Sequence, residues 1–400
     1  GGLPPVFLAQ KMYSALDSFP LLAVPFFIVA GDIMQKGTIA NSLLAVSRCL
    51  VGHIKGGMAH ISILTSLFYG ALSGSAAATV AAVGGIMIPA MEKEGYPKEF
   101  ATAVNSTSGC LGIMIPPSIP LILFGSTAGV SISDLFVATI VPGILMGCAL
   151  VLVSYVICVR RKYGKTVARA KFAEMLKALY EAKWAIMVPV IVLGGIYGGL
   201  TTPTEAAAVS VVYGLVVGVF IYREVKMKDM IDILVDSGKT TGGIMLIIGA
   251  ATLFSYVCTV FGIAQAAQAL LLEISGNKYI FLLIVNVIFL IAGCFVDANS
   301  AMYIFIPIMY PVATQLGIDP VHFGVIATVN LAIGQVTPPV GVNLFVAIGV
   351  SEKLQGLRDK TKVTIVSMSK AVWPQIVACI IALLLITYVP WFSTVLLFGK

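Results

Sequence analysis

Charged residues are scarce in this sequence. Asp, Glu, Lys and Arg together form 11% of the 400 residues, against about 25% in a soluble domain. Hydrophobic residues form 59%, and several apolar runs reach the roughly 20 residues that span a bilayer. This composition excludes a soluble protein and predicts an all-α polytopic membrane protein.

The usual residues of catalysis and metal binding are also sparse. The three histidines, His53, His60 and His322, share no ligand spacing with the seven cysteines, and no cysteines form a C-x-x-C pair. The sequence has no G-x-x-x-x-G-K-[ST] loop, which excludes an ATP-driven pump within this chain. Intramembrane proteases need a serine with a histidine partner or two neighbouring acids, and neither pair is evident. We therefore expect no enzymatic activity and no bound cofactor.

The basic residues that are present concentrate between apolar runs. Residues 160–183 contain eight Lys or Arg and two acids, and residues 223–239 add four more basic residues. Lys and Arg mark the cytoplasmic loops of membrane proteins. Two apolar spans, 184–200 and 204–222, separate these segments, so both predict the same side of the membrane. Topology accounts for the net charge of +7, and we expect no binding to nucleic acid.

A repeated texture divides the remaining chain. Gly and Pro are frequent in 72–125 and again in 296–349, and a shift of 222 places the Pro-Pro pair 116–117 on 338–339. A shift of 218 places Pro89 on Pro307. Each half therefore predicts a short hairpin followed by a broken helix. Further apolar spans are expected near 19–35, 48–70, 134–158, 240–262, 279–296 and 374–398.

The Pro-Pro pairs indicate a binding site. Proline removes a backbone N–H and obstructs the preceding turn, so no helix runs unbroken through Pro338–Pro339. Freed backbone groups in hydrocarbon cost several kcal/mol each unless protein or water satisfies them. The two ends of a broken helix attract an anion and a cation. Paired interruptions in matching halves point to the mid-membrane site of a transporter.

Asp297 is the strongest candidate side chain. Histidine aside, it is the only acid or base between Tyr279 and Gly317, and ionisable groups at membrane depth are functional candidates. Asn299 and Ser300 follow it with neutral oxygens, which suit a hard cation such as Na⁺. Alternatively, Asp297 caps a half-helix at a water-exposed hairpin tip.

The first hairpin offers the hydroxyls of Ser73, Ser75 and Thr79 as oxygen ligands. Alternatively, Ser73-Gly74-Ser75 is a small-residue packing motif of a membrane helix. Thr337 precedes a Pro-Pro break, where a hydroxyl beside bare carbonyls predicts a cation ligand.

Three polar residues have structural interpretations. Asn330 and Asn343 flank the second break and either bond the freed carbonyls, which we favour, or contact substrate. Glu205 completes the capping box "TPTE" over 202–205, so we assign it to helix initiation.

The motifs together resemble one transporter family. They are "SGSAAATVAAVGGIMIPAM", "GIMIPPSIPLILFG", "GLTTPTEAAAV", "DANSAMYIFIPIMYPVA" and "GIDPVHFGVIATVNLAIGQVTPPVGVNLFVA". Nearly the whole chain resembles the large membrane subunit, of DctM type, of the tripartite ATP-independent periplasmic (TRAP) transporters. Members normally begin with one further apolar helix, and this chain begins Gly1-Gly2 without Met, so we expect the natural protein to extend further.

The resemblance implies a fold of two inverted repeats, each with a re-entrant helical hairpin and a Pro-Pro-broken helix, that works as an elevator like other ion-transporter-superfamily proteins. The predicted organisation is scaffold and arm helices over 1–71, a first transport repeat over 72–158 (hairpin 72–91, broken helix 100–125), a basic loop with scaffold helices over 159–239, arm and linking helices over 240–296, a second transport repeat over 297–350 (hairpin 297–314, broken helix 322–349), and a C-terminal loop and helix over 351–400.

The resemblance also implies site residues. The Na⁺ ligands expected from it are Ser73, Ser75, Gly109, Gly112, Asp297, Asn299, Ser300, Gly334 and Thr337. The substrate contacts expected from it are Ser75, Thr79, Pro117, Asn299, Pro339 and Asn343.

The activity implied is Na⁺-coupled import of a small organic anion, a C4-dicarboxylate or sialic acid, with two or more Na⁺ ions, across a bacterial or archaeal inner membrane. The implied partners are a small four-helix membrane subunit, separate or fused, and a soluble periplasmic substrate-binding protein. The main alternative is a passive channel built on the same broken helices, which would conduct without saturation or Na⁺ coupling.

Overall fold

The computed structural model describes residues 5–35, 39–164, 168–353 and 363–397, and all regular elements in these ranges are helices. Within these described ranges, seven helices are long and apolar enough to cross a membrane. An eighth span results if Val6–Leu16 and Phe19–Gln35, which meet at 62°, count as one. The prediction of an all-α polytopic membrane protein is thereby confirmed.

The first part of the chain contains a bent N-terminal span, a hairpin, a broken helix and a long closing helix. Its elements are α1 (Pro5–Leu16), η1 (Phe19–Leu22), α2 (Ala23–Gln35), α3 (Ile39–Val51), α4 (Gly57–Ser73), α5 (Ala76–Lys93), α6 (Lys98–Ser108), α7 (Leu111–Met114), α8 (Ile119–Ala128), α9 (Ile132–Ala138) and α10 (Ile140–Arg161).

Two connecting helices precede a similar second part. The connection consists of α11 (Phe172–Tyr197), α12 (Pro203–Leu215) and the π-helical η2 (Val216–Ile221). The second part consists of α13 (Met227–Val260), α14 (Ile263–Ser275), α15 (Lys278–Phe295), α16 (Ala298–Gln315), α17 (Pro320–Gly334), α18 (Val342–Lys353), α19 (Ile365–Tyr388) and α20 (Trp391–Thr394).

A constant offset relates the two parts. Adding 222 to the bounds of α5 gives those of α16, and the same offset brings the starts of α3, α4 and α6 within two residues of those of α14, α15 and α17. The offset places Pro89 on Pro311, so the match of Pro89 with Pro307 predicted from a shift of 218 is corrected. The stretch "IPIMYP" contains two prolines, so the sequence alone does not show which of them corresponds to Pro89. The helix bounds decide this.

Each hairpin has two full arms. α4 and α5 meet at Gly74, whose φ of +60° favours glycine, and α15 and α16 meet before Asp297. The predicted hairpins 72–91 and 297–314 contain only the tips and the second arms. The sequence analysis assigns the first arms to the plain apolar spans 48–70 and 279–296, because neither arm contains the prolines that mark the second arms.

The basic segment 223–239 is not a loop throughout. α13 begins at Met227, where the Asp229 carboxylate accepts from Lys226 N–H at 3.0 Å, and it continues unbroken across the predicted boundary at 239–240. Similarly, α19 begins at Ile365, before the predicted span 374–398. Most of the loop predicted after 351 lies outside the described residues.

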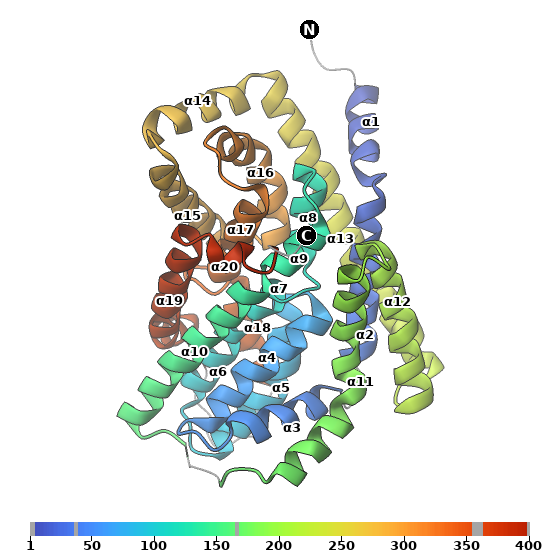
Figure 1. The fold of residues 1–400 in the computed structure, drawn as a ribbon, viewed down its shortest axis with the longest axis vertical. Coiled ribbons are helices and arrows are strands. Elements are labelled where there is room, and N and C mark those ends of the chain that lie inside the picture. Colours follow the sequence, from blue (N-terminus) through green and yellow to red (C-terminus); the bar gives the residue numbers. More distant parts are fainter. Residues whose placement is uncertain (1–4, 36–38, 165–167, 354–362, 398–400) are drawn as a thin grey trace.

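The two halves interlock. α8, which follows the first break, packs against α16 and α17 of the second half, and α18, which follows the second break, packs against α5 and α6 of the first. Figure 1 shows the first hairpin low in the view and the second hairpin high, with α8 near the second and α18 near the first. Each broken helix therefore joins both hairpins into one body.

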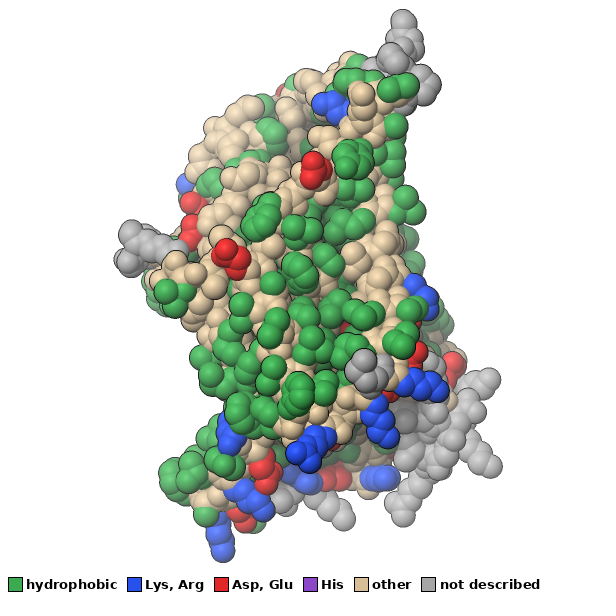
Figure 2. All heavy atoms as spheres, turned by 90° about the vertical axis from the view of Figure 1, so that its right-hand side faces the viewer, with side chains coloured by type: hydrophobic (Ala, Val, Ile, Leu, Met, Phe, Trp, Pro, Cys, Tyr) green, Lys and Arg blue, Asp and Glu red, His purple; other side chains and the backbone are tan. Residues whose placement is uncertain are grey.

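Outer helices cover one side of this body. α2 packs against α12 and α13, and α1 lies along α13 (right side of Figure 1). Figure 2 shows that this side is largely hydrophobic and that Lys and Arg side chains gather at its lower end. A basic end below an apolar belt fits the positive-inside rule and supports the prediction that the lower end faces the cytoplasm.

Glycine pairs permit the closest helix contacts. A Cβ on Gly70 would lie 2.8 Å from Gly112 Cα, and a Cβ on Gly334 would lie 2.5 Å from Gly293 Cα. In both halves the first hairpin arm thus touches the backbone of the broken helix just before its break. Any side chain at these positions would push the hairpin off the break.

We expect Gly334→Ala to destabilise the protein by about 1–3 kcal/mol, because the added methyl group overpacks a backbone contact. The measurement is the apparent Tm of purified protein in detergent. Gly238→Ala, at a helical position with no atom within 4 Å of the new Cβ, is the matched control and should leave the Tm unchanged or slightly raised. Equal Tm values for the two variants would contradict the close-contact interpretation.

Candidate functional site

Both hairpin tips open on one cavity of about 530 Å³, which we call the tip cavity. The first tip contributes Ser73, Ser75 and Ala78, and the second contributes Asp297 and Asn299. α2 and α13 form the opposite wall. The structure therefore brings together two tips that lie more than 200 residues apart in the sequence.

The first tip is held by a hydroxyl cluster. Ser73 Oγ lies 3.0 Å from Thr79 Oγ1, and Thr79 Oγ1 donates to the Ser75 carbonyl at 2.8 Å. The Ser75 hydroxyl caps α5 by accepting from Ala78 N–H. Thr79 is fully buried behind the tip and is not among the residues that line the tip cavity. It therefore lies with the predicted Na⁺ ligands and not at the position expected of a substrate contact.

The first break lies directly against this cluster. A Cβ on Gly112 would lie 2.4 Å from Thr79 Oγ1 and 2.7 Å from the Ser75 carbonyl oxygen, and one on Gly109 would lie 3.3 Å from the Ala76 carbonyl oxygen. Pro117, beyond the break, is buried with its carbonyl oxygen against Gly74. The residues of the first predicted Na⁺ site thus form one oxygen-rich group.

The second tip is organised by Asp297. Its Oδ2 accepts from the N–H groups of Asn299 and Ser300 at 3.0 and 3.3 Å, and the Ser300 hydroxyl donates to its Oδ1. Asp297 is therefore the N-cap of α16, as the structural alternative predicted. Capping leaves the carboxylate lining the tip cavity, so it does not exclude cation binding.

Two amide side chains at this tip and break lack partners. Asn299 Oδ1 is buried without a hydrogen bond, and neither amide atom of the fully buried Asn343 has one. The prediction that Asn343 bonds the carbonyls freed by the break is therefore wrong. Asn299 also lines the tip cavity, so its oxygen is a candidate to contact an ion or solute, whereas Asn343 is fully buried outside the lining of that cavity.

The second break closes on the second hairpin. Gly334 touches Gly293, and Gly341 N–H donates to the Cys294 carbonyl at 3.0 Å. The Thr337 hydroxyl donates to the Ile333 carbonyl at 2.7 Å, which leaves its lone pairs available to a cation. Pro339, unlike buried Pro117, is exposed.

The capping role of Glu205 is confirmed, whereas Asn330 bonds within the bundle and not to a carbonyl freed by the break, and its own side-chain oxygen has no partner. Asn330 donates to Asn286 Oδ1 at 2.7 Å and to the Ile326 carbonyl, within the bundle. Thr202 and Glu205 form the predicted capping box at the start of α12, with Thr202 N–H donating to Glu205 Oε2 at 2.8 Å.

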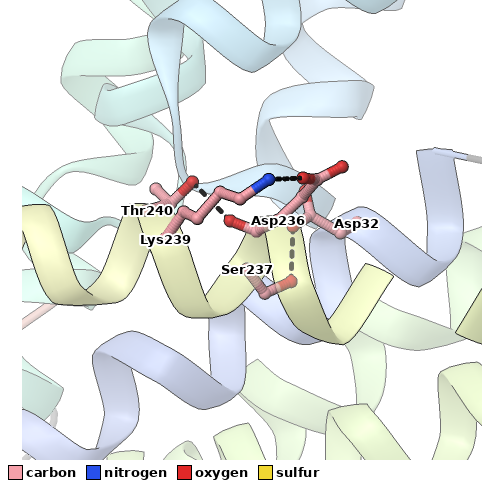
Figure 3. Close-up of polar contacts among 5 residues, drawn as sticks. All are labelled: Asp32, Asp236, Ser237, Lys239 and Thr240. Carbon is pink, nitrogen blue, oxygen red and sulfur yellow. Dashed lines mark hydrogen bonds and ion pairs between the residues drawn. The ribbon is translucent and has the colours of Figure 1, made fainter. Parts of the chain in front are cut away.

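The wall opposite the tips carries residues that the sequence analysis missed. Asp32 of α2 lines the cavity and accepts from the buried Ser237 hydroxyl of α13 at 2.5 Å, and Lys239 lines it while pairing with Asp236 at 3.1 Å (Figure 3). A lone acid in the apolar span 19–35 was a signal for Asp32. The sequence analysis assigns Lys239 to a cytoplasmic loop, so it is not predicted to line a cavity.

The cavity has an acidic excess. Its charged lining consists of the carboxylates of Asp32 and Asp297 and the ammonium of Lys239, whose charge is shared with Asp236. Such a space repels an anion until cations occupy it. The oxygen-rich groups behind both tips are suited to receive those cations.

Comparison with known proteins shows the family of this chain. The family profile described as "Tripartite ATP-independent periplasmic transporter, DctM component" matches residues 1–392. The C4-dicarboxylate TRAP transporter large permease protein DctM of Pseudomonas aeruginosa is 39% identical over 97% of this chain and 88% of its own length. The sialic acid TRAP transporter large permease protein SiaM of Vibrio cholerae is 36% identical, over 98% of this chain and 89% of its own length. The chain therefore belongs to the DctM family of TRAP transporter large permeases.

Two further matches are a longer relative and a solved structure of low sequence identity. The isethionate TRAP transporter permease protein DctMQ of Oleidesulfovibrio alaskensis is 43% identical over 98% of this chain, which spans 60% of that relative's length. The crystal structure of the Alcanivorax borkumensis YdaH transporter, reported to have an unusual topology, matches with a TM-score of 0.60 at 16% identity. It covers 96% of this chain and 87% of its own chain, and it shows a shared fold.

We expect a cysteine at either hairpin tip to react with a water-soluble maleimide in inside-out vesicles, because both tips line one cavity. The variants are Ser75→Cys and Asn299→Cys, and the measurement is peptide mass spectrometry of labelled inside-out vesicles. Ser108→Cys, at a fully buried position near the first break, is the control and should stay unlabelled. Labelling of one tip without the other would show that they do not share the cavity.

Proposed function

We propose that this DctM-family chain imports a small organic anion across a bacterial or archaeal cytoplasmic membrane, coupled to Na⁺ entry, by elevator-type alternating access. The observation that carries the proposal is the tip cavity, on which the hairpins of both halves open together. A space reached from two related hairpins is the arrangement expected of a transporter site at the interface of its repeats.

The site residues support two cation positions. The first consists of Ser73, Ser75 and Thr79 against Gly112, where hydroxyl and carbonyl oxygens converge. The second consists of Asp297 and Ser300 with the unpartnered Asn299 oxygen, near the break that begins after Gly334. Hard oxygens and one carboxylate suit Na⁺ better than a transition metal.

Cation binding explains how an anion enters an acidic cavity. The carboxylates of Asp32 and Asp297 face the space in which the anion must lie. Bound Na⁺ would neutralise the tip, and the half-helix N-termini at the breaks add a favourable field for negative charge. The anion therefore follows the cations, which links uptake to Na⁺.

The driving force is sufficient. Each Na⁺ that enters down about 100 mV contributes about 2.3 kcal/mol. With a monovalent anion two ions leave one net positive charge moving inward, whereas with a dicarboxylate dianion they leave none and the Na⁺ concentration gradient supplies the driving force. For a monovalent anion the same gradient adds to the electrical term.

The names of the relatives suggest a class of solute and of partner proteins for this chain. Those named above handle C4-dicarboxylates, sialic acid and isethionate by their names, and all three are small organic anions. The DctMQ relative extends well beyond the region matched by this chain. We propose a small membrane subunit and a soluble binding protein as partners, with the binding protein delivering the anion.

The test is uptake into proteoliposomes that contain the chain with its small subunit and binding protein. Radiolabelled succinate, N-acetylneuraminate and isethionate are offered with and without an inward Na⁺ gradient. We expect saturable accumulation of one of them that requires Na⁺. Uptake that neither saturates nor depends on Na⁺ would favour the channel alternative, and no uptake of any of the three would overturn the proposed solute class.

We expect Asp297→Ser to raise the Na⁺ concentration for half-maximal uptake about ten- to a hundredfold, because the substitution retains an N-cap but removes the charged ligand. Asp319→Ser is the matched control, since Asp319 caps α17 outside the tip cavity by accepting from His322 N–H. Equal Na⁺ dependence in both variants would leave Asp297 with a capping role only.

A further inference from the structure

A second cavity lies on the boundary between the interlocked halves and the outer helices. It has a volume of about 320 Å³ and no charged lining residue, and we call it the hydroxyl cavity. Its hydroxyl groups come from Ser18, Ser126, Thr127, Thr252, Ser255 and Tyr303. Six convergent hydroxyls offer hydrogen-bond donors to a solute without any fixed charge.

The two cavities share their walls. α13 lines the tip cavity through 239–247 and the hydroxyl cavity through Thr252 and Ser255. α16 lines the first through Asn299 and the second through Tyr303. Both are therefore chambers along a single boundary, and Ser18 of the outer layer lies 3.5 Å from Ser126 of α8 across it, between their hydroxyl oxygens.

The outer walls of the two cavities are counterparts under the offset of 222. Ser18 corresponds to Thr240, which lines the tip cavity. Thr252 and Ser255 correspond to positions 30 and 33 of α2, on either side of Gly31 and Asp32 in the tip cavity. Each outer wall thus contains the middle of one span and the last part of the other. The tip cavity has the middle of α13 with the end of α2, and the hydroxyl cavity has the junction of α1 and η1 with the later part of α13.

The inner sides of the cavities are not counterparts. The tip cavity faces hairpin tips, whereas the hydroxyl cavity faces the middle of α16 and the end of α8. The interlocked halves therefore sit off-centre on a pseudo-symmetric outer layer. The counterparts of Tyr303 and Thr127 are Ala81 and Gly349, and both are uncovered: Ala81 is exposed, and no atom lies within 4 Å of a Cβ on Gly349.

We infer that the hydroxyl cavity marks a second docking position, in which the hairpin tips face Ser18, Thr252 and Ser255 and the solute contacts these hydroxyls. This inference rests on the proposed function and adds to it a second solute-contacting wall. The mirrored arrangement would place the small, uncovered surface of α5 and α18 against the first half of α13. The two lining segments of α13 are about ten residues apart, so the displacement is about 15 Å at 1.5 Å per residue.

The two walls differ in charge, which assigns them different roles. The hydroxyl wall is neutral and binds an anion by donation, whereas the tip-cavity wall presents the Asp32 carboxylate. The charged wall also lies nearer the basic, cytoplasmic end, because α13 starts just after the basic segment 223–226. The hydroxyl wall therefore receives the anion, and the acidic wall favours its release into the cytoplasm.

Cysteine cross-linking tests the second position without knowledge of the solute. Ala78 reports the first hairpin tip, because it lines the tip cavity without belonging to either cation group. The pair Ala78→Cys with Thr240→Cys reports the present arrangement, and Ala78→Cys with Thr252→Cys reports the inferred one. Ala78→Cys with Phe254→Cys is the matched control, since Phe254 lies at the same level of α13 but is 53% exposed and lines neither cavity.

Native membranes that contain each full-length pair are treated with a short bismaleimide, and linked peptides are identified by mass spectrometry. We expect the Thr240 and Thr252 pairs to link and the Phe254 pair to remain at the level of protein without added cysteines. A Thr252 pair that links no more than the Phe254 pair would overturn the inference, even if Na⁺-dependent uptake is found. Linking without Na⁺-dependent uptake would instead retain the second position and reject the proposed coupling.

The neutrality of the hydroxyl wall has its own test. Thr252→Asp should raise the KM for the accumulated anion at least tenfold by repulsion, whereas Thr252→Asn, of similar shape, should change it less than threefold. The measurement is initial uptake of radiolabelled succinate, N-acetylneuraminate and isethionate at saturating Na⁺. Equal KM values for Asp and Asn would show that the solute does not meet this wall.

Discussion

The structure depends on how backbone groups are satisfied where helices break at membrane depth. An unpaired N–H or carbonyl in hydrocarbon costs several kcal/mol, so a broken helix persists only where protein or water supplies partners. Here each break is enclosed by a hairpin of its own half. Ser118 Oγ donates to the Ile113 carbonyl in the first, and Gly341 N–H donates to the Cys294 carbonyl in the second. The side-chain oxygen of Asn299 remains unpaired, and this residue lines the tip cavity.

Close approach of backbones makes this enclosure possible. The pairs Gly70–Gly112 and Gly293–Gly334 bring a hairpin arm onto the broken helix without intervening side chains. The second halves of the broken helices then cross to the opposite hairpin, so that neither repeat can form its core alone. This exchange explains why the two tips, built far apart in the sequence, open on one cavity.

Charge separates the roles of the walls around that cavity. The tips present oxygens suited to cations, and the opposite wall adds Asp32 and Lys239 from helices outside the interlocked halves. In the proposed mechanism an anion is admitted together with cations, and the outer wall that faces the tips sets its affinity. The outer layer is pseudo-symmetric, but the wall of the tip cavity carries the Asp32 carboxylate and the wall of the hydroxyl cavity is neutral. The two walls therefore interact differently with an anion.

Composition and punctuation in the sequence determined the membrane class, the two Pro-Pro breaks and the candidates Ser73, Ser75 and Asp297, because proline and charge at membrane depth act locally and need no partner to be recognised. The sequence did not reveal the first hairpin arms, since a plain apolar helix is the same whether it spans or re-enters. It also missed Asp32 and Lys239 as site residues and assigned Asn343 a partner that it lacks. Those facts depend on which helices pack together, and only the tertiary structure, through contacts between residues about 200 positions apart, decides them.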